Sequence, residues 1–126
     1  MKLIGIAGLL LISAAATAAD FTPAEICKAT ISVEFGRDVK SMKAKMAGDN
    51  PEVSYRRDDG DSFKYQCQVS EDSVVWRTFL NDTKTWGRWR NRYSDGDAHV
   101  TYKIEGSRLD MTSNQSGSES FTKSSF

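Results

Sequence analysis

The sequence predicts an α+β domain, in which one or two N-terminal helices pack on a five- or six-stranded antiparallel β-meander. Two observations indicate this class. Apolar residues recur at helical spacing in the first part of the chain and alternate with polar residues in the rest. Short runs rich in Gly, Asp, Asn and Ser separate the alternating segments. Strands joined by such short turns pair as antiparallel neighbours and leave one face for the helices to cover.

The first 19 residues are expected to be a cleaved signal peptide rather than part of the fold. Lys2 supplies a positive charge, residues 3–12 are almost wholly apolar, and residues 13–19 are small. The apolar stretch is shorter than the ~20 residues that a membrane span needs. Cleavage would leave residues 20–126 as a single periplasmic or secreted domain without a membrane span.

The first helix is expected to begin at a capping box. Thr22 is placed as the N-cap, Pro23 as the first helical residue and Glu25 as the third. An apolar stripe that includes Cys27 follows, and Gly36 is placed to end the helix. Cys27 is therefore expected to face the interior.

A second, shorter helix is expected over residues 38–47. Val39, Met42 and Met46 would lie on one side of it. The run Gly-Asp-Asn-Pro at residues 48–51 is expected to end this helix. Both helices would cover the same face of the sheet.

Strands are expected from residue 52 onward, because apolar and polar residues then alternate. Cys67 falls on the apolar side of one of these strands. The expected strands cover residues 52–55, 62–69, 74–80, 85–92, 99–105, 108–112 and 120–125.

Cys27 and Cys67 are expected to form a disulfide that ties the helix to the sheet. Both side chains are predicted to face inward, and an exported chain with two cysteines favours a bridge. The alternatives are a free thiol pair, a metal site or a catalytic thiol. A metal site needs three or four ligands, and His99 alone does not complete one with two thiols. We therefore expect no metal and no cofactor.

Composition and motifs exclude several function classes. A chain of 126 residues with 17 basic and 17 acidic side chains predicts neither a multidomain enzyme nor a nucleic-acid partner bound by net positive charge. The single histidine, His99, is predicted on the polar face of its strand. A Ser-His-Asp or Cys-His set is then not indicated. The protein is therefore not expected to be an enzyme.

The most unusual segment reads Trp-Gly-Arg-Trp-Arg-Asn-Arg-Tyr over residues 86–93. Three arginines on one side of a strand repel one another unless acidic groups or an anionic ligand compensate them. Guanidinium groups bind carboxylate, phosphate or sulfate through paired hydrogen bonds, and tryptophan can stack on a ligand. The segment therefore predicts a binding surface for an acidic protein or an anionic envelope component. If the strand is extended, the residues on this surface are Trp86, Arg88, Arg90 and Arg92.

The same charges have an intramolecular explanation. Residues 49–72 contain seven acidic and three basic side chains, whereas residues 77–92 contain five basic and one acidic. Neighbouring strands would pair these charges across the sheet, each exposed pair contributing about 0–1 kcal/mol. The protein would then be a structural envelope protein.

The leading hypothesis is a non-enzymatic binding or inhibitor-type module that uses the Arg-Trp strand. A further hypothesis is an envelope enzyme that uses the turn carboxylates Asp58, Asp59 and Asp61. The identity of the partner and the oligomeric state stay open at this point.

Several short motifs are spread over most of the predicted mature chain. They are Ile26-Cys27-Lys28, Gly36-Arg37-Asp38, the Asp58-Asp59-Gly60 turn before Tyr65-Gln66-Cys67, and Gly87-Arg88-Trp89-Arg90. With these motifs the chain resembles a group of small exported bacterial proteins of uncharacterised function. The resemblance implies an exported domain with a disulfide and transfers no functional site.

Overall fold

The computed structural model describes residues 20–126, and the predicted signal peptide at residues 1–19 lies outside this range. Within residues 20–126, one α-helix and eight strands make up the fold. They are α1 (Pro23–Phe35), β2 (Lys43–Ala47), β3 (Asn50–Arg56), β4 (Ser62–Val69), β5 (Ser73–Leu80), β6 (Thr85–Trp86), β7 (Val100–Glu105), β8 (Arg108–Ser113) and β9 (Gly117–Phe121). Three short 3-10 turns are η2 (Val39–Ser41), η3 (Tyr93–Asp95) and η4 (Lys123–Ser125). The α+β class is as predicted.

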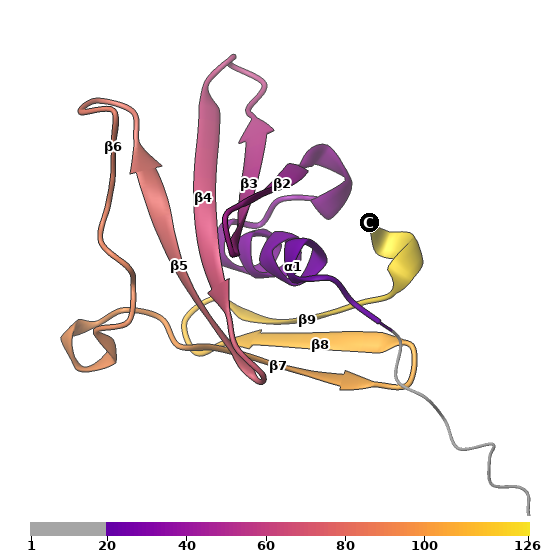
Figure 1. Cartoon of the computed structure of the whole chain (residues 1–126). Coiled ribbons are helices and arrows are strands. Elements are labelled where there is room, and N and C mark those ends of the chain that lie inside the picture. The colour runs from indigo at the N-terminus through magenta and orange to yellow at the C-terminus, as the bar shows by residue number, and fades with distance from the viewer. Residues whose placement is uncertain (1–19) are drawn as a thin grey trace, which may run out of the picture.

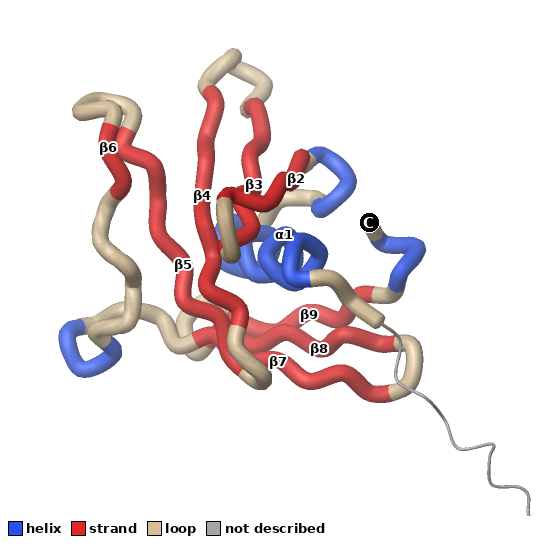
Figure 2. Tube along the Cα trace, viewed as in Figure 1, coloured by secondary structure: helices blue, strands red, loops and turns tan. Residues whose placement is uncertain are grey.

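The strands form one antiparallel sheet that curls around the helix. Its order is β2-β3-β4-β5-β7-β8-β9, and β6 pairs with the far end of β5. Only the first two residues of β5 pair with β7, so the sheet changes direction there. In Figure 1, β3, β4 and β5 run across the direction of β7, β8 and β9, and α1 lies between the two groups. Figure 2 shows the same bend in the strand trace.

The capping box at the start of α1 is formed as predicted. The Thr22 Oγ1 accepts from the Glu25 N–H at 3.1 Å, and the Thr22 N–H donates to Glu25 Oε1 at 2.9 Å. The helix ends at Gly36, whose φ of 67° is the left-handed conformation that glycine adopts without steric cost. Both helix ends are therefore specified locally.

The predicted second helix at residues 38–47 is wrong. The segment contains only the single turn η2, after which β2 begins at Lys43. Val39 and Met42 are both buried, as helical spacing suggested, but Met46 is 50% exposed. The end of this segment forms a strand rather than a helix because the two-residue turn after Ala47 brings five residue pairs of β2 and β3 into register.

The predicted count of five or six strands is too low. β2 adds a strand that the sequence assigned to a helix, and the sheet contains eight strands in all. The predicted strand at residues 85–92 is present only at Thr85–Trp86. The last predicted strand is also displaced, because β9 ends at Phe121 and η4 follows.

The disulfide between Cys27 and Cys67 is present and links α1 to β4, with 5.8 Å between the two Cα atoms. Both cysteines are fully buried. Ile31, Val53 and Leu109 are also fully buried, so the core lies between α1 and both groups of strands. Among the described residues, no helix has the length and apolar character to cross a membrane.

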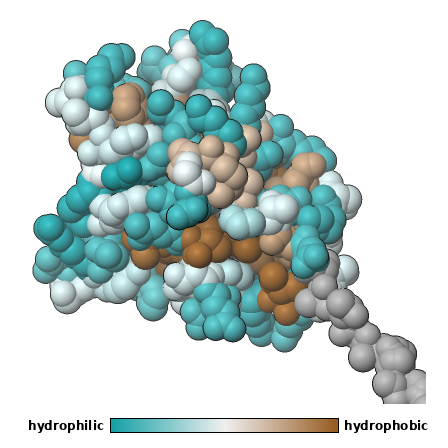
Figure 3. Space-filling view, in the orientation of Figure 1, coloured by the Kyte–Doolittle hydropathy of each residue, from teal (hydrophilic) through white to brown (hydrophobic). Residues whose placement is uncertain are grey.

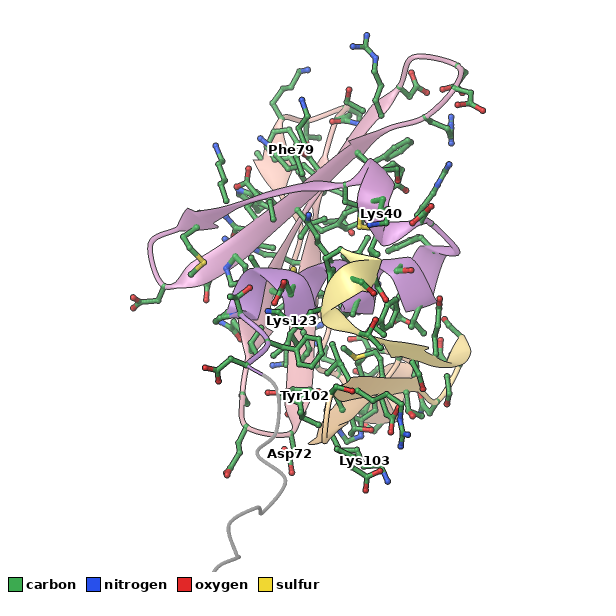
Figure 4. The ribbon with its side chains drawn as sticks, turned by 90° about the vertical axis from the view of Figure 1, so that its right-hand side faces the viewer. Lys40, Asp72, Phe79, Tyr102, Lys103 and Lys123 are labelled. Atoms are coloured by element: carbon green, nitrogen blue, oxygen red, sulfur yellow. A yellow bond between two sulfur atoms is a disulfide. The ribbon has the colours of Figure 1, made fainter. Side chains whose placement is uncertain are left out.

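The end of the chain packs beside the two edges of the curled sheet. The Lys40 Nζ donates to the Ser124 carbonyl at 3.0 Å, and the Lys123 Nζ donates to Glu25 Oε1 at 2.6 Å. In Figure 4, Lys40 and Lys123 lie near the short η4 turn, next to α1. The Phe126 ring contacts the Phe21 ring with 6.2 Å between centroids. These contacts hold η4 against the start of the domain.

Replacing both bridge cysteines by alanine should lower the free energy of unfolding by about 2–4 kcal/mol, because the bridge restricts a loop of about 40 residues in the unfolded chain. Urea denaturation of wild type and Cys27→Ala/Cys67→Ala measures the difference. Wild type treated with dithiothreitol should lose a similar amount. Two reactive thiols in the folded, unreduced protein would contradict the bridge.

Candidate binding surface

The face of the sheet that points away from α1 is a candidate binding surface. Residues that pair across neighbouring strands share a face, and Val53, Tyr65 and Cys67 are buried toward the helix. Their neighbours along each strand therefore point outward. The part of this face formed by β2 to β6 and the residue Trp89 after β6 is called the outer face here. It consists of Lys43, Lys45, Glu52, Ser54, Arg56, Ser62, Lys64, Gln66, Gln68, Val75, Arg77, Phe79, Trp86 and Trp89.

A row of polar contacts crosses four strands of the outer face. The Lys45 Nζ lies 3.8 Å from Glu52 Oε2, and Gln66 Nε2 donates to Glu52 Oε1 at 3.3 Å. Arg77 donates to Gln66 Oε1 from Nε at 3.0 Å and from Nη2 at 2.7 Å. The Arg77 guanidinium is therefore held in a fixed orientation by the amide of its neighbour.

Aromatic rings flank the cations at the end of this row. The Arg77 Cζ lies 5.0 Å from the Trp86 ring centroid and 4.4 Å from that of Trp89. The Lys64 Nζ lies 4.3 Å from the Phe79 centroid and 5.7 Å from that of Trp86. Cations at these distances are attracted to the ring faces. The outer face thus presents interleaved cations and rings on a rigid sheet.

Trp86 is placed on this face by its pairing with Phe79, whereas Trp89 reaches the same face because the segment after β6 is not a regular strand. The Gly87 N–H donates to the Thr78 carbonyl at 2.8 Å, and the Arg90 N–H donates to the Trp76 carbonyl at 2.9 Å. A Cβ at Gly87 would lie 3.3 Å from the Thr78 oxygen, so a larger residue at this position would be crowded against β5. The irregular path brings the Trp86 and Trp89 rings to the same guanidinium, that of Arg77.

The four residues predicted to share a face are separated by this path. Trp86 lies on the outer face, whereas Arg90 lies over the Trp76 ring at 5.9 Å. The Trp76 ring contacts Phe35 of α1 at 5.4 Å, so Arg90 is on the helix side of the sheet. The prediction of one continuous face is therefore wrong.

The arginines of the segment converge on one buried carboxylate. Arg88 donates to Asp97 from Nη1 at 2.6 Å and from Nη2 at 2.9 Å, and the Arg90 Nη1 lies 3.6 Å from Asp97 Oδ1. The Arg92 backbone N–H also donates to Asp97, at 2.8 Å, while its side chain is exposed. The Asp97 side chain is 5% exposed, whereas those of Arg88 and Arg90 are 39% and 45% exposed. Asp97 therefore fixes the loop between β6 and β7.

Hydrogen bonds and nearby positive charge strongly lower the pKa of the Asp97 carboxyl group. The Arg88 guanidinium holds the pKa of Asp97 well below its ordinary value of 3.8, against the opposing effect of burial. The Arg92 N–H and the Arg90 charge lower this pKa further. The carboxylate is thus ionised throughout the neutral pH range.

The acidic turn does not pair with the arginines of the 86–93 segment. Arg57 binds Asp59 at 2.7 Å and Asp61 at 3.1 Å within the turn itself. The hydrogen bond from Arg57 lowers the pKa of Asp59. The expected pairing between residues 49–72 and 77–92 is therefore replaced by local pairs on each side. Asp58, Asp59 and Asp61 are exposed at the end of the β3–β4 hairpin.

A shallow depression of about 320 Å³ lies on the outer face beside the aromatic rings. Its walls include three lysines and Ser54. The lining residues are Lys43, Ala44, Lys45, Glu52, Ser54 and Lys64. Glu52 is already engaged by Lys45 and Gln66. The lysines therefore leave this depression with excess positive charge.

A second cavity, of about 260 Å³, lies on the opposite side near Trp76 and Arg90. The Trp76 Nε1–H donates to Glu34 Oε2 at 3.1 Å. The other carboxylate oxygen of Glu34 is buried and accepts no hydrogen bond from residues 20–126. The indole therefore ties the end of α1 to β5 and leaves the carboxylate only half satisfied.

His99 lines neither the depression on the outer face nor the cavity near Trp76. His99 is exposed, as predicted, and stacks on Tyr93 with 4.4 Å between ring centroids. Within residues 20–126, no cluster of three or more His, Cys, Asp or Glu side chains is arranged to hold a metal ion.

The fold and the outer face together define an α+β domain in which one disulfide-anchored helix covers one face of a sheet and a basic, aromatic layer forms the other. No family model, curated protein or solved structure matches this chain. The resemblance to small exported bacterial proteins therefore stays a prediction.

Replacing the buried carboxylate in Asp97→Asn should lower the free energy of unfolding at neutral pH, because Arg88 and Arg90 lose their shared counter-charge. The pKa of Asp97 is lower in the folded than in the unfolded chain, so its ionised form stabilises the fold above about pH 4 and this stabilisation is lost as the pH falls further. The difference between wild type and variant should therefore be constant from pH 7 to about pH 5 and shrink progressively below about pH 4, down to about pH 2. Urea denaturation across that range measures it, and a pH-independent difference would contradict the assignment.

Proposed function

We propose that this protein is an exported, non-enzymatic binding module that holds an anionic partner on its outer face. The observation that carries the proposal is the charge of that face. Its only acidic residue is Glu52, against five basic residues. The basic residues are Lys43, Lys45, Arg56, Lys64 and Arg77. This excess of four positive charges lies on one side of a chain whose overall formal charge is zero.

The contacts around Arg77 support a binding role because they fix the cation before a partner arrives. Gln66 holds the guanidinium from one side, and Trp86 and Trp89 flank it. A side chain ordered in advance loses less conformational entropy on binding than a free one. An arginine is also protonated at every physiological pH, so it binds anions without exchanging protons.

A binding role also accounts for residues that were predicted from the sequence to form the binding surface. Trp86 belongs to the proposed surface. Arg88 and Arg90 are assigned a positioning role through Asp97, because this contact holds the loop that carries Trp86 and Trp89. Export is supported by the disulfide, since such bonds persist in oxidising compartments.

A second candidate function is that of a structural envelope protein with internally paired charges. The bidentate contact between Arg88 and Asp97 favours it, as does the pairing of Arg57 within its own turn. The two candidates make different predictions for the outer face, because a purely structural face would show no selectivity for anions.

Charge reversal in Lys43→Glu/Lys64→Glu should weaken binding to immobilised polyanions by about tenfold or more. The probes are dextran sulfate and poly-L-glutamate, and binding should weaken as salt is added because exposed charges are screened. Biolayer interferometry measures the affinities.

The matched control is Lys28→Glu/Lys103→Glu, which changes the net charge equally but lies on α1 and β7. In Figure 4, Lys103 is at the opposite end of the molecule from Phe79 of the outer face. Equal loss of binding in both double variants would show that only net charge matters. Unchanged binding in Lys43→Glu/Lys64→Glu would refute the outer face as the surface.

A further inference from the structure

We infer that the outer face binds a linear acidic polysaccharide, with anionic groups on Lys43 and Lys64 and a sugar ring against Trp86. This inference rests on the proposed function and specifies its partner. It depends on three observations. They are the arrangement of the outer-face residues across the strands, the spacing of the charged residues, and the kinds of side chain that lie between those charged residues.

The residues form a row that runs across the strands. Lys43 pairs in register with Ser54, and Ser54 pairs with Lys64. The Lys64 ammonium lies over the Phe79 ring, and Phe79 pairs with Trp86. The row therefore crosses five consecutive strands from β2 to β6, a span of about 19 Å at the usual spacing of about 4.8 Å. An extended polymer can lie along such a row.

The charges in this row are two strands apart. Lys43 and Lys64 are separated by the strand that carries Ser54, so their backbones are about 10 Å apart. Two sugar rings joined in line extend over a similar distance, and many acidic polysaccharides have one anionic group for every two sugars. Alternate side chains of an extended peptide repeat at only about 7 Å, which matches the row less well.

The groups between the charges suit a sugar rather than a protein. The Ser54 hydroxyl lies between the two lysines, and the depression between them is lined by polar and charged side chains except for Ala44. Protein interfaces are usually depleted in lysine and depend on apolar anchors in desolvated pockets. Hydroxyl groups of a sugar can bond to Ser54, and the apolar face of a sugar ring can pack against an indole.

The two hairpins that carry residues of the row project from the body of the molecule. In Figure 3, the hairpins that project at the top of the view are mostly hydrophilic, and brown atoms gather nearer the centre. These projecting hairpins are β3–β4 and β5–β6, which carry Lys64 and Trp86.

Isothermal titration with three anionic probes and one neutral control, dextran, tests the inference. The probes are hyaluronan oligosaccharides with one carboxylate per disaccharide, poly-L-glutamate of equal charge, and phosphatidylglycerol vesicles. The hyaluronan fragments should bind at least about tenfold more tightly than either other probe. Neutral dextran should bind at least about tenfold more weakly than hyaluronan, because it lacks the anionic groups.

The variant Trp86→Ala should weaken hyaluronan binding by about tenfold and leave poly-L-glutamate binding nearly unchanged. Its matched control is Tyr93→Ala, which removes an exposed ring near His99, away from the row. If circular dichroism shows that Trp86→Ala has lost its fold, Trp86→Phe and Lys43→Gln replace it. Trp86→Phe keeps a ring and should retain binding, whereas Lys43→Gln should weaken hyaluronan binding.

The outcomes separate the two proposals. Poly-L-glutamate or vesicles that bind as tightly as hyaluronan, with loss in Lys43→Glu/Lys64→Glu, would overturn the polysaccharide and keep the anionic surface. Equal binding of hyaluronan by wild type, Trp86→Phe and Lys43→Gln would overturn the row as its site. Failure of every anionic probe to bind would overturn both the inference and the proposed function.

Discussion

A single helix covers only one face of the curled sheet, and this constraint shapes the rest of the molecule. The Cys27–Cys67 bridge fixes α1 on the concave side, where Ile31 and Leu109 are fully buried. A sheet with one covered face normally exposes polar side chains on the other. Here the uncovered side of β3, β4 and β5 presents cations and aromatic rings together. The amino acids available for a partner are therefore those that the helix leaves uncovered.

The outer face has contacts that take the place of a second covering layer. Hydrogen bonds join Glu52, Gln66 and Arg77 across three strands, and the rings of Trp86 and Trp89 flank the guanidinium. Each contact is modest in water, but together they order long side chains that would otherwise move freely. The resulting surface is both rigid and positively charged. These two properties favour recognition of an anion through electrostatic complementarity.

Much of the fold could be predicted from local sequence signals, whereas the arrangement of the site could not. The capping box at Thr22 and the alternation around Cys67 each specify an element and its inward direction, and so predict the bridge. The helical spacing of Val39 and Met42 was misleading, because a single 3-10 turn followed by a short strand buries the same two residues. The partner of Arg88 could not be predicted, because its contact with a carboxylate nine residues later depends on the path of an irregular loop. The only sequence signal for that carboxylate was its place in a turn, where acidic residues are common for local reasons.

We propose that anions bind on the outer face and not at another basic part of the chain. Titration of ¹⁵N-labelled protein with a polyanion, followed by two-dimensional NMR, locates the surface directly. If anions bind there, the indole N–H signals of Trp86 and Trp89 and the amide signals of β2 to β4 should shift together, while the amide signals of β8 and β9 should not. Shifts confined to β7 to β9 or to η4, with both indole signals unchanged, would contradict it.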